Sequence, residues 1–273
     1  MAALLRIIEK IISRLPYKVF FTVGAGIGLL AYHLDNQHRF TAISNISRAL
    51  EVSPDRARAI ARKAFINSGI NIIEFFNANT FTRPPWVGIT GIENIDWDKG
   101  NIFVLGHFGN WELLGRIGAQ YSLQLVAVGR GIKSKGLDKY IQERRTFSGL
   151  ELVNKKGSFK HLLRGLKQGK SAAILIDQYA GRRGVFVDFL GIPTSTTASP
   201  VLLALRTGCP IVPVFIIRER AGHRIFIESP VTVVKTGNIN RDIQTGTQLM
   251  VRPLERYVKR YPDQWWWVHR RWR

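Results

Sequence analysis

After Gly88 the chain alternates between short apolar runs and longer segments with helical periodicity. Chains with this alternation usually fold as a mostly parallel sheet with helices packed on its faces. The runs expected to form strands cover residues 101–106, 123–128, 150–153, 171–176 and 211–217, with a hairpin partner at 223–228. The segments expected to form helices are 111–121, 134–148, 157–169, 197–207 and 240–261. The sequence therefore predicts an α/β domain over residues 86–273.

The first 85 residues lack this alternation and predict a helical layer that associates with a membrane. Residues 1–15 would place leucine and isoleucine on one helical face and basic residues on the other, which suits a bilayer interface or, equally, packing on a protein core. Residues 19–32 carry no charge, but as a helix they would span about 21 Å, short of the ~30 Å hydrocarbon core. A monotopic or re-entrant anchor is therefore favoured over a full crossing. Further helices are expected at 39–50 and from Pro54 onward, which makes residues 1–85 an anchoring helical region.

The balance of charge indicates which partners the surface attracts. Forty Lys and Arg oppose nineteen Asp and Glu, which gives a formal net charge of +21. Such a surface recruits anions, and three partners fit: nucleic acid, the anionic face of a membrane, or an acidic carrier protein together with a phosphorylated substrate. Cys209 is the only cysteine, so an internal disulfide and a cysteine-cluster metal site are both excluded.

A histidine and a carboxylate within residues 101–112 predict a general base. His107 follows an apolar run that ends at Gly106, and Glu112 comes five positions later at the start of a helical segment. On one continuous helix the two side chains would point about 140° apart, but at the end of a strand and in the next helical turn they can converge. A carboxylate beside an imidazole fixes its tautomer and stabilises the imidazolium. The alternative is that His107 caps a loop and Glu112 complements the helix N-terminus.

Other polar residues are candidates for the same site. Asn110 lies in the turn between His107 and Glu112. Asp177 closes an apolar strand, where an unpaired carboxylate is costly, although a simple turn residue is the alternative. In parallel sheets the ligand crevice lies beyond the carboxyl ends of the strands, which is where His107 and Asp177 are expected. Arg130 and the lysines after it either hold a substrate phosphate or form a charged surface loop.

Five sequence blocks, taken in order, give the chain a family resemblance. They are GHFGNWE at 106–112, IDQ at 176–178, GVFVDFLGIP at 184–193, TGCPIVPV at 207–214 and YPDQWWWVHRRW at 261–272. In this combination the sequence resembles the bacterial lipid A late acyltransferases (lauroyl and myristoyl transferases) over nearly its whole length, a branch of the lysophospholipid acyltransferase superfamily. The His-x4-Glu spacing is that of the lipid A branch, where the superfamily usually has His-x4-Asp. The Phe-Pro-Glu-Gly block of the glycerolipid enzymes is missing, which puts in doubt a phosphate-binding role copied from them.

The resemblance implies an O-acyltransferase at the cytoplasmic face of the bacterial inner membrane. Such an enzyme moves a fatty acyl group from acyl carrier protein to a hydroxyl of a lipid A precursor, with no cofactor; a coenzyme A thioester is the alternative donor. His107 would take the hydroxyl proton and Glu112 would orient the imidazole. The resemblance also assigns Asp177 to the site, bound to an arginine, and makes either Arg144 or Arg145 the functional arginine of the family.

Two other functions remain open at this point. A protein of the same fold could acylate another membrane acceptor, such as a glycosylated phospholipid, a lysophospholipid or an aminolipid. A non-catalytic basic protein that binds membranes or nucleic acid would also explain the charge and the C-terminal tryptophans, but the sequence has no recognisable nucleic-acid reader motif, so nucleic acid is not an expected partner. His161, His223 and His269 show no partner at ligand spacing, so we interpret them as structural and expect no metal.

Overall fold

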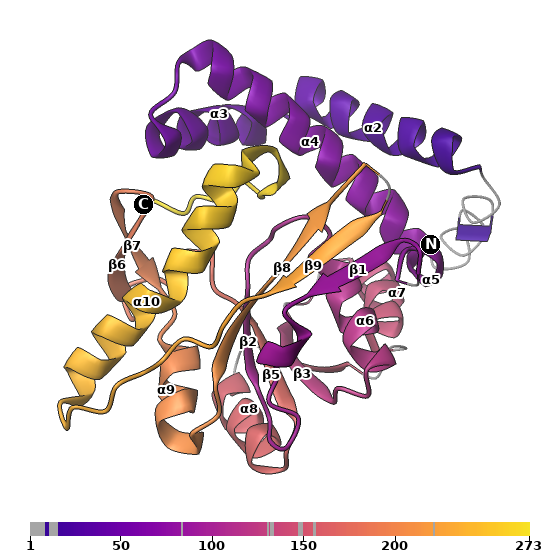
Figure 1. Cartoon of the computed structure of the whole chain (residues 1–273). Helices are drawn as coiled ribbons and strands as arrows, with labels where there is room; N and C mark the ends of the chain where they lie inside the picture. The colour runs from indigo at the N-terminus through magenta and orange to yellow at the C-terminus, as the bar shows by residue number, and fades with distance from the viewer. Residues whose placement is uncertain are drawn as a thin grey trace.

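The computed structural model describes residues 9–10, 16–82, 84–129, 131, 134–146, 150–154, 157–220 and 222–273. Its centre is a seven-stranded sheet with the strand order β1-β9-β8-β2-β5-β3-β4 (Figure 1). The strands of this sheet are β1 (Val87–Thr90), β2 (Ile102–Leu105), β3 (Leu125–Gly129), β4 (Glu151–Asn154), β5 (Ser171–Leu175), β8 (Ile211–Arg218) and β9 (His223–Ile227). β8 and β9 pair antiparallel, and the other neighbouring strands pair parallel. The predicted fold class, a mostly parallel sheet flanked by helices, is confirmed.

Three strands of the structure were not predicted from the sequence. β1 is a four-residue edge strand of intermediate burial, so it lacks the buried apolar run that marks the other strands. β6 (Val185–Phe189) and β7 (Ile192–Thr196) form a separate antiparallel hairpin. Ser, Thr and Pro make up most of β7, which is why its sequence does not read as a strand.

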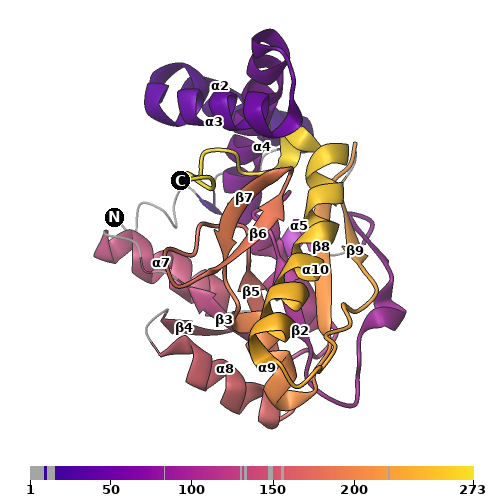
Figure 2. The ribbon, with the colours of Figure 1, turned by 90° about the vertical axis from the view of Figure 1, so that its left-hand side faces the viewer.

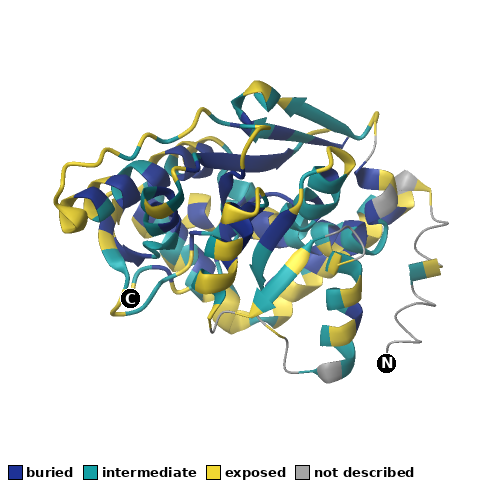
Figure 3. Cartoon of the chain, turned by 90° about the horizontal axis from the view of Figure 1, so that it is seen from below, coloured by how far each residue is buried: buried dark blue, intermediate teal, exposed yellow. Residues whose placement is uncertain are grey.

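Alternate residues of the central strands point to opposite faces of the sheet. Ile102 and Val104 belong to a buried cluster with residues of α8 (Ser158–Lys167), α9 (Ser199–Thr207) and α10 (Ile239–Arg260). Figure 2 shows α10 in front of the strands. Phe103 packs on the other face with residues of α6 (Leu114–Gln120). The central strands β2 and β8 are mostly buried, whereas the edge strands β1 and β4 are intermediate or exposed, and Figure 3 shows both kinds of strand from below. Both faces of the sheet are therefore covered, as parallel sheets require.

The N-terminal helices lie across the carboxyl ends of the central strands. They are α2 (Tyr17–Leu34), α3 (Asn36–Leu50), α4 (Pro54–Phe76) and the short α5 (Ala78–Phe81). Three asparagines tie this layer to the rest of the chain: Asn45 donates to the Trp267 carbonyl at 2.8 Å, Asn67 to the Asp263 carbonyl at 2.8 Å, and Asn71 to the Gly109 carbonyl at 2.6 Å. The layer thus contacts both the loop after β2 and the C-terminal segment.

Glycines let α2 and α4 pack in direct backbone contact. A Cβ atom on Gly28 would lie 2.2 Å from the Phe65 carbonyl oxygen, and one on Gly69 would lie 2.2 Å from the Gly24 carbonyl oxygen. Gly24 and Gly28 lie in the uncharged segment that we considered as a membrane anchor, and Gly69 lies in α4. Among the described residues no helix is both long and apolar enough to cross a membrane. Apart from Glu9 and Lys10, the expected helix over 1–15 lies outside the described residues.

Candidate active site

The parallel register of β2 and β5 brings His107 and Asp177 together. Leu105 of β2 pairs with Leu175 of β5, and His107 and Asp177 each follow two residues later. His107 Nδ1 lies 2.7 Å from Asp177 Oδ1, and the backbone N–H of His107 donates to Oδ2 at 2.6 Å. The indole Nε1 of Trp265 donates to the same Oδ2 at 2.9 Å. Asp177 is completely buried, and these three contacts supply the partners that its carboxylate needs.

The two side chains shift each other's pKa in opposite directions. Burial by itself would raise the pKa of Asp177, but the charge and the hydrogen bond of His107 outweigh burial and hold it well below the ordinary value of 3.8. Burial would likewise lower the pKa of His107, but the Asp177 carboxylate raises it above 6.5, and the charge of Glu112 adds to this effect. Asp177 therefore stays ionised and accepts the proton on Nδ1, which leaves Nε2 of the neutral imidazole free to take a proton.

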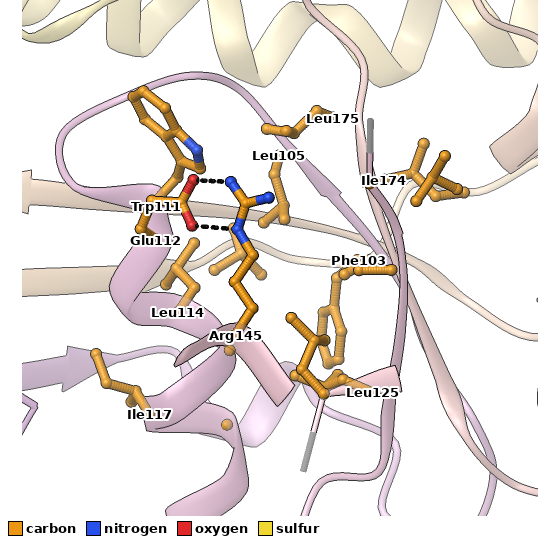
Figure 4. A pocket seen from close by; sticks show the side chains of 18 of the residues that line it. Phe103, Leu105, Trp111, Glu112, Leu114, Ile117, Leu125, Arg145, Ile174 and Leu175 are labelled. Atoms are coloured by element: carbon orange, nitrogen blue, oxygen red, sulfur yellow. Dashed lines mark hydrogen bonds and ion pairs between the residues drawn. The ribbon is translucent and has the colours of Figure 1, made fainter. Parts of the chain in front are cut away.

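Glu112 binds an arginine instead of the histidine. It lies in the short helical turn η2 (Trp111–Leu113), where Arg145 Nε donates to its Oε2 at 2.8 Å and Arg145 Nη2 donates to its other oxygen (Figure 4). The carboxylate hydrogen-bonded to the imidazole is thus Asp177, and our expectation that Glu112 orients His107 is corrected. The expectation that Asp177 binds an arginine was also wrong, because its partners are the imidazole and an indole. The sequence could not show that β2 and β5 are neighbours.

The two candidate arginines of α7 (Lys135–Thr146) have different partners. Arg145 holds Glu112, whereas Arg144 pairs with Glu9 at 2.6 Å and donates to the Phe76 carbonyl at 2.8 Å. The structure therefore connects Arg145 directly to the His-x4-Glu motif. Arg130, the other candidate for binding phosphate, lies outside the described residues.

Asn110 anchors the loop between His107 and Glu112 to a buried polar cluster. Its side chain donates to Glu74 Oε2 at 2.8 Å, and Glu74 also contacts Arg218 and His223. Burial would raise the pKa of Glu74, but the Arg218 guanidinium outweighs this, with help from His223, and lowers it to about 2. Glu74 is therefore a charged group in the interior, and it fixes one side of the loop.

A pocket of about 890 Å³ adjoins His107 and reaches between the sheet and α6. Figure 4 shows Glu112 and Arg145 at one end, with Phe103, Leu125 and Ile117 further along. Gln178 also contributes to the polar part of the lining. An apolar pocket that ends at a few polar groups suits a ligand with a long hydrocarbon chain and one reactive polar end.

The C-terminal segment completes the site, which the sequence did not indicate. The backbone N–H of Trp266 donates to the His107 carbonyl at 3.0 Å, and the His269 ring lies 4.9 Å from the His107 ring. We had interpreted His269 as structural because nothing near it in the sequence suggests a partner. Its contact with His107 joins residues 162 positions apart, which no local pattern reveals. Within the described part of the chain, no group of three or more His, Cys, Asp or Glu could hold a metal ion.

Comparison with known sequences identifies the family. The sequence profile described as "Bacterial lipid A biosynthesis acyltransferase" matches residues 2–273. The chain belongs to this family. This lipid A family acyltransferase is therefore an enzyme, and its candidate site is built from the loop after β2, the end of β5, α7 and the C-terminal segment.

Similar proteins include enzymes whose names refer to three kinds of lipid. The acyltransferase is 25% identical to the lipid A biosynthesis lauroyltransferase of Escherichia coli, over 96% of this chain and 87% of that protein. It is 24% identical to the lipid A biosynthesis palmitoleoyltransferase of E. coli, over 94% and 86%. It is 26% identical to the phosphatidylinositol mannoside acyltransferase of Mycolicibacterium smegmatis, over 65% and 58%. The crystal structure of the 1-acyl-sn-glycerophosphate acyltransferase PlsC from Thermotoga maritima is similar over 92% of this chain and 98% of that one, with a TM-score of 0.39 and 16% identity.

Proposed function

We propose that this acyltransferase moves a fatty acyl chain from an acyl carrier protein thioester to a hydroxyl group of a lipid A precursor. His107 Nε2 takes the proton from the hydroxyl as its oxygen attacks the thioester carbonyl. Asp177 holds the imidazole and stabilises the imidazolium, and the imidazolium then protonates the departing thiolate. General-base catalysis of this kind typically contributes about 10² to 10⁴ in rate.

The observation that carries this proposal is the position of His107 beside the apolar pocket. The imidazole is fixed at Nδ1 by a completely buried carboxylate, and the pocket next to it is lined by residues such as Phe103 and Leu125. A fatty chain in the pocket would bring its thioester carbon to the polar end, beside the base. The ion pair between Glu112 and Arg145 lies at the same end of the pocket.

The charge of the molecule supports acyl carrier protein as the donor. The chain has a net charge of +21, and acidic carrier proteins are attracted to such a surface. Coenzyme A thioesters carry phosphates and are the competing donor. Because carrier-dependent transfer takes place in the cytoplasm, we place the enzyme at the cytoplasmic face of the bacterial inner membrane.

An exposed apolar stripe on α2 supports association with that membrane. The stripe consists of Val19, Val23, Ile27, Leu30 and Leu34, which recur every three or four residues and are 40% to 72% exposed. The opposite face of α2 packs on α4 through glycines. A helix with one buried face and one apolar exposed face can lie in the interface of a bilayer without crossing it. We therefore propose a monotopic enzyme that receives its lipid acceptor from the membrane surface.

The test is acyl transfer by the purified protein, followed by mass spectrometry of the lipid product. Acyl carrier protein and coenzyme A thioesters of one chain length are each offered with a lipid A precursor, a phosphatidylinositol mannoside or lysophosphatidate. We expect the lipid A precursor to be acylated fastest, and the carrier protein thioester to be the better donor. Acylation of only the mannoside or only lysophosphatidate would reject the proposed acceptor, and equal or faster transfer from coenzyme A would reject the proposed donor.

A further inference from the structure

Gln178 lies between two imidazoles at the polar end of the pocket. Its side-chain nitrogen is 3.4 Å from His107 Nε2 and 3.2 Å from His269 Nε2. A carboxamide nitrogen carries two N–H bonds, and a neutral imidazole has one nitrogen that accepts. Because Asp177 accepts the proton on His107 Nδ1, Nε2 is the acceptor of that ring. The geometry points to an amide that donates one N–H to each imidazole.

The C-terminal segment holds Gln178 by its backbone as well as by its side chain. Arg271 Nη1 donates to the Gln178 carbonyl at 2.6 Å and to the Ser195 carbonyl at 3.0 Å, while Nη2 donates to Thr196 Oγ1 at 2.6 Å. Arg271 is completely buried, and burial lowers its pKa to about 10. Burying a guanidinium with only carbonyl and hydroxyl partners costs free energy. Its hydrogen bonds fix the backbone of Gln178. The side chain of Gln178, in contrast, is exposed and lines the pocket.

We propose that Gln178 donates a hydrogen bond to the oxyanion formed at the thioester carbonyl, and that His269 is the positioning residue that keeps the amide N–H directed there. This inference rests on the proposed function, because it concerns the same reaction. A carboxamide can present either its NH₂ group or its oxygen, and only the NH₂ group stabilises an oxyanion. A neutral acceptor at His269 Nε2 selects the NH₂ orientation, since it takes one N–H and leaves the other for the site.

The proposed step accounts for every atom. The acceptor oxygen forms a bond to the thioester carbon, its proton moves to His107 Nε2, and the carbonyl oxygen becomes an oxyanion. In this step the hydroxyl replaces the resting contact between His107 and Gln178, and the released N–H of Gln178 turns to the oxyanion. When the carbon–sulfur bond breaks, the oxyanion returns to a carbonyl and the thiolate takes the proton from the imidazolium. Preorganised donors of this kind are worth about 10² to 10³ in kcat when one is removed.

The surroundings of His269 keep its ring neutral. Burial, together with the neighbouring His107, Arg271 and His38, lowers the pKa of His269 to about 4, and only Asp177 opposes this shift. At neutral pH the ring is therefore neutral, and with its one proton on Nδ1 its Nε2 accepts from the amide. Its backbone is fixed as well, because Asn45 of α3 donates to the His269 carbonyl at 2.8 Å. A protonated ring would donate instead and would turn the amide oxygen toward the site.

The experiment measures kcat and KM for two reactions, acyl transfer to the lipid acceptor and hydrolysis of the same thioester by water. Both pass through the oxyanion, but only the first needs the lipid acceptor. We expect Gln178→Ala and Gln178→Glu to lower kcat about 10²- to 10³-fold in both reactions with little change in KM. His269→Ala should lower kcat about tenfold, the loss expected for one orienting hydrogen bond. His269→Gln, which can offer an acceptor oxygen near the position of Nε2, should recover most of that loss.

A double variant separates positioning from an independent role. If His269 acts through Gln178, the variant Gln178→Ala/His269→Ala will be no slower than Gln178→Ala alone.

The controls change two exposed residues outside the site. They are Gln168→Ala, which precedes the start of β5, and His161→Ala on the exposed face of α8, and thermal melting confirms that each variant is folded. A folded Gln178→Ala variant with a kcat within threefold of the wild type would overturn the inference. So would a double variant whose loss in kcat equals the product of the losses in the two single variants. If the wild-type protein hydrolyses the thioester but acylates no lipid A precursor, the proposed acceptor is contradicted and this test remains valid. If it does neither reaction, the proposed function itself is contradicted.

Discussion

Asp177 is the residue that holds the His107 imidazole in place. It is completely buried, and its carboxylate accepts from the imidazole, from the His107 backbone and from the Trp265 indole. Glu112, which is closer to His107 in the sequence, is held by Arg145 and reaches the imidazole only through its charge. The histidine thus has a near carboxylate that fixes its tautomer and a second one that adds to the negative field.

At this scale we predict the pH dependence of an Asp177→Asn variant. His107 must be neutral to act as a base, so kcat/KM rises with pH through the His107 pKa, which Asp177 holds above 6.5. Loss of that charge leaves burial and Arg145 lowering the pKa and Glu112 raising it, with His269 the remaining ionisable neighbour. The midpoint of the rising limb should therefore move to lower pH, while the maximal rate falls about 10²- to 10⁴-fold. A pH profile of kcat/KM checks this, and an unchanged midpoint would show that Asp177 does not set the basicity of His107.

Helix α4 is the element that links the N-terminal layer to the active site. Asn71 and Glu74 on this helix hold Gly109 and Asn110, so the loop that carries His107 rests on α4. Helix α2 packs on the other side of α4, where Gly28 and Gly69 allow the two backbones to meet. A glycine-containing segment that we considered as a membrane anchor is therefore also a packing element.

The two faces of α2 predict opposite effects for two glycine substitutions. A Cβ atom on Gly28 would meet the Phe65 carbonyl, so Gly28→Ala should reduce the free energy of unfolding by about 1–3 kcal/mol. A Cβ atom on Gly26 has no neighbour within 4 Å, so Gly26→Ala should be neutral or stabilise by up to ~1 kcal/mol through helix propensity. Thermal and denaturant unfolding of both variants measures the difference. A Gly28→Ala variant as stable as Gly26→Ala would show that α2 does not pack closely on α4 in solution.

For the molecule as a whole, the exposed stripe of α2 gives the proposed membrane surface. Leu30 and Ile27 are 59% and 40% exposed, and the glycines that contact α4 lie on another face of α2. The double variant Ile27→Glu/Leu30→Glu should bind vesicles of anionic phospholipid at least about tenfold more weakly, because each buried side chain of this size contributes ~1.5–3 kcal/mol. Its melting temperature should stay close to that of the wild type. Val234→Glu, at an exposed apolar residue outside the stripe, is the control. Equal vesicle binding by the stripe variant would remove α2 from the membrane surface.

The sequence predicted much of this architecture, and its errors at the candidate site have a common cause. Strands such as 101–106 and 171–176 could be located because they are apolar runs bounded by turns, and this also placed His107 and Asp177 at strand ends. The partner of His107 could not be predicted, because β2 and β5 become neighbours only when the sheet forms. For the same reason His269 and Arg271 were missed as parts of the site. Their contacts join distant parts of the chain and leave no local pattern.

The most direct measurement is the rate of acyl transfer to a lipid A precursor by wild-type protein, His107→Ala and the exposed control His161→Ala, with the product identified by mass spectrometry. If the imidazole held by Asp177 is the general base, His107→Ala will fold normally and lose at least about 10²-fold in kcat, while His161→Ala keeps the wild-type rate. A folded His107→Ala variant that transfers the acyl chain as fast as the wild type would contradict the account.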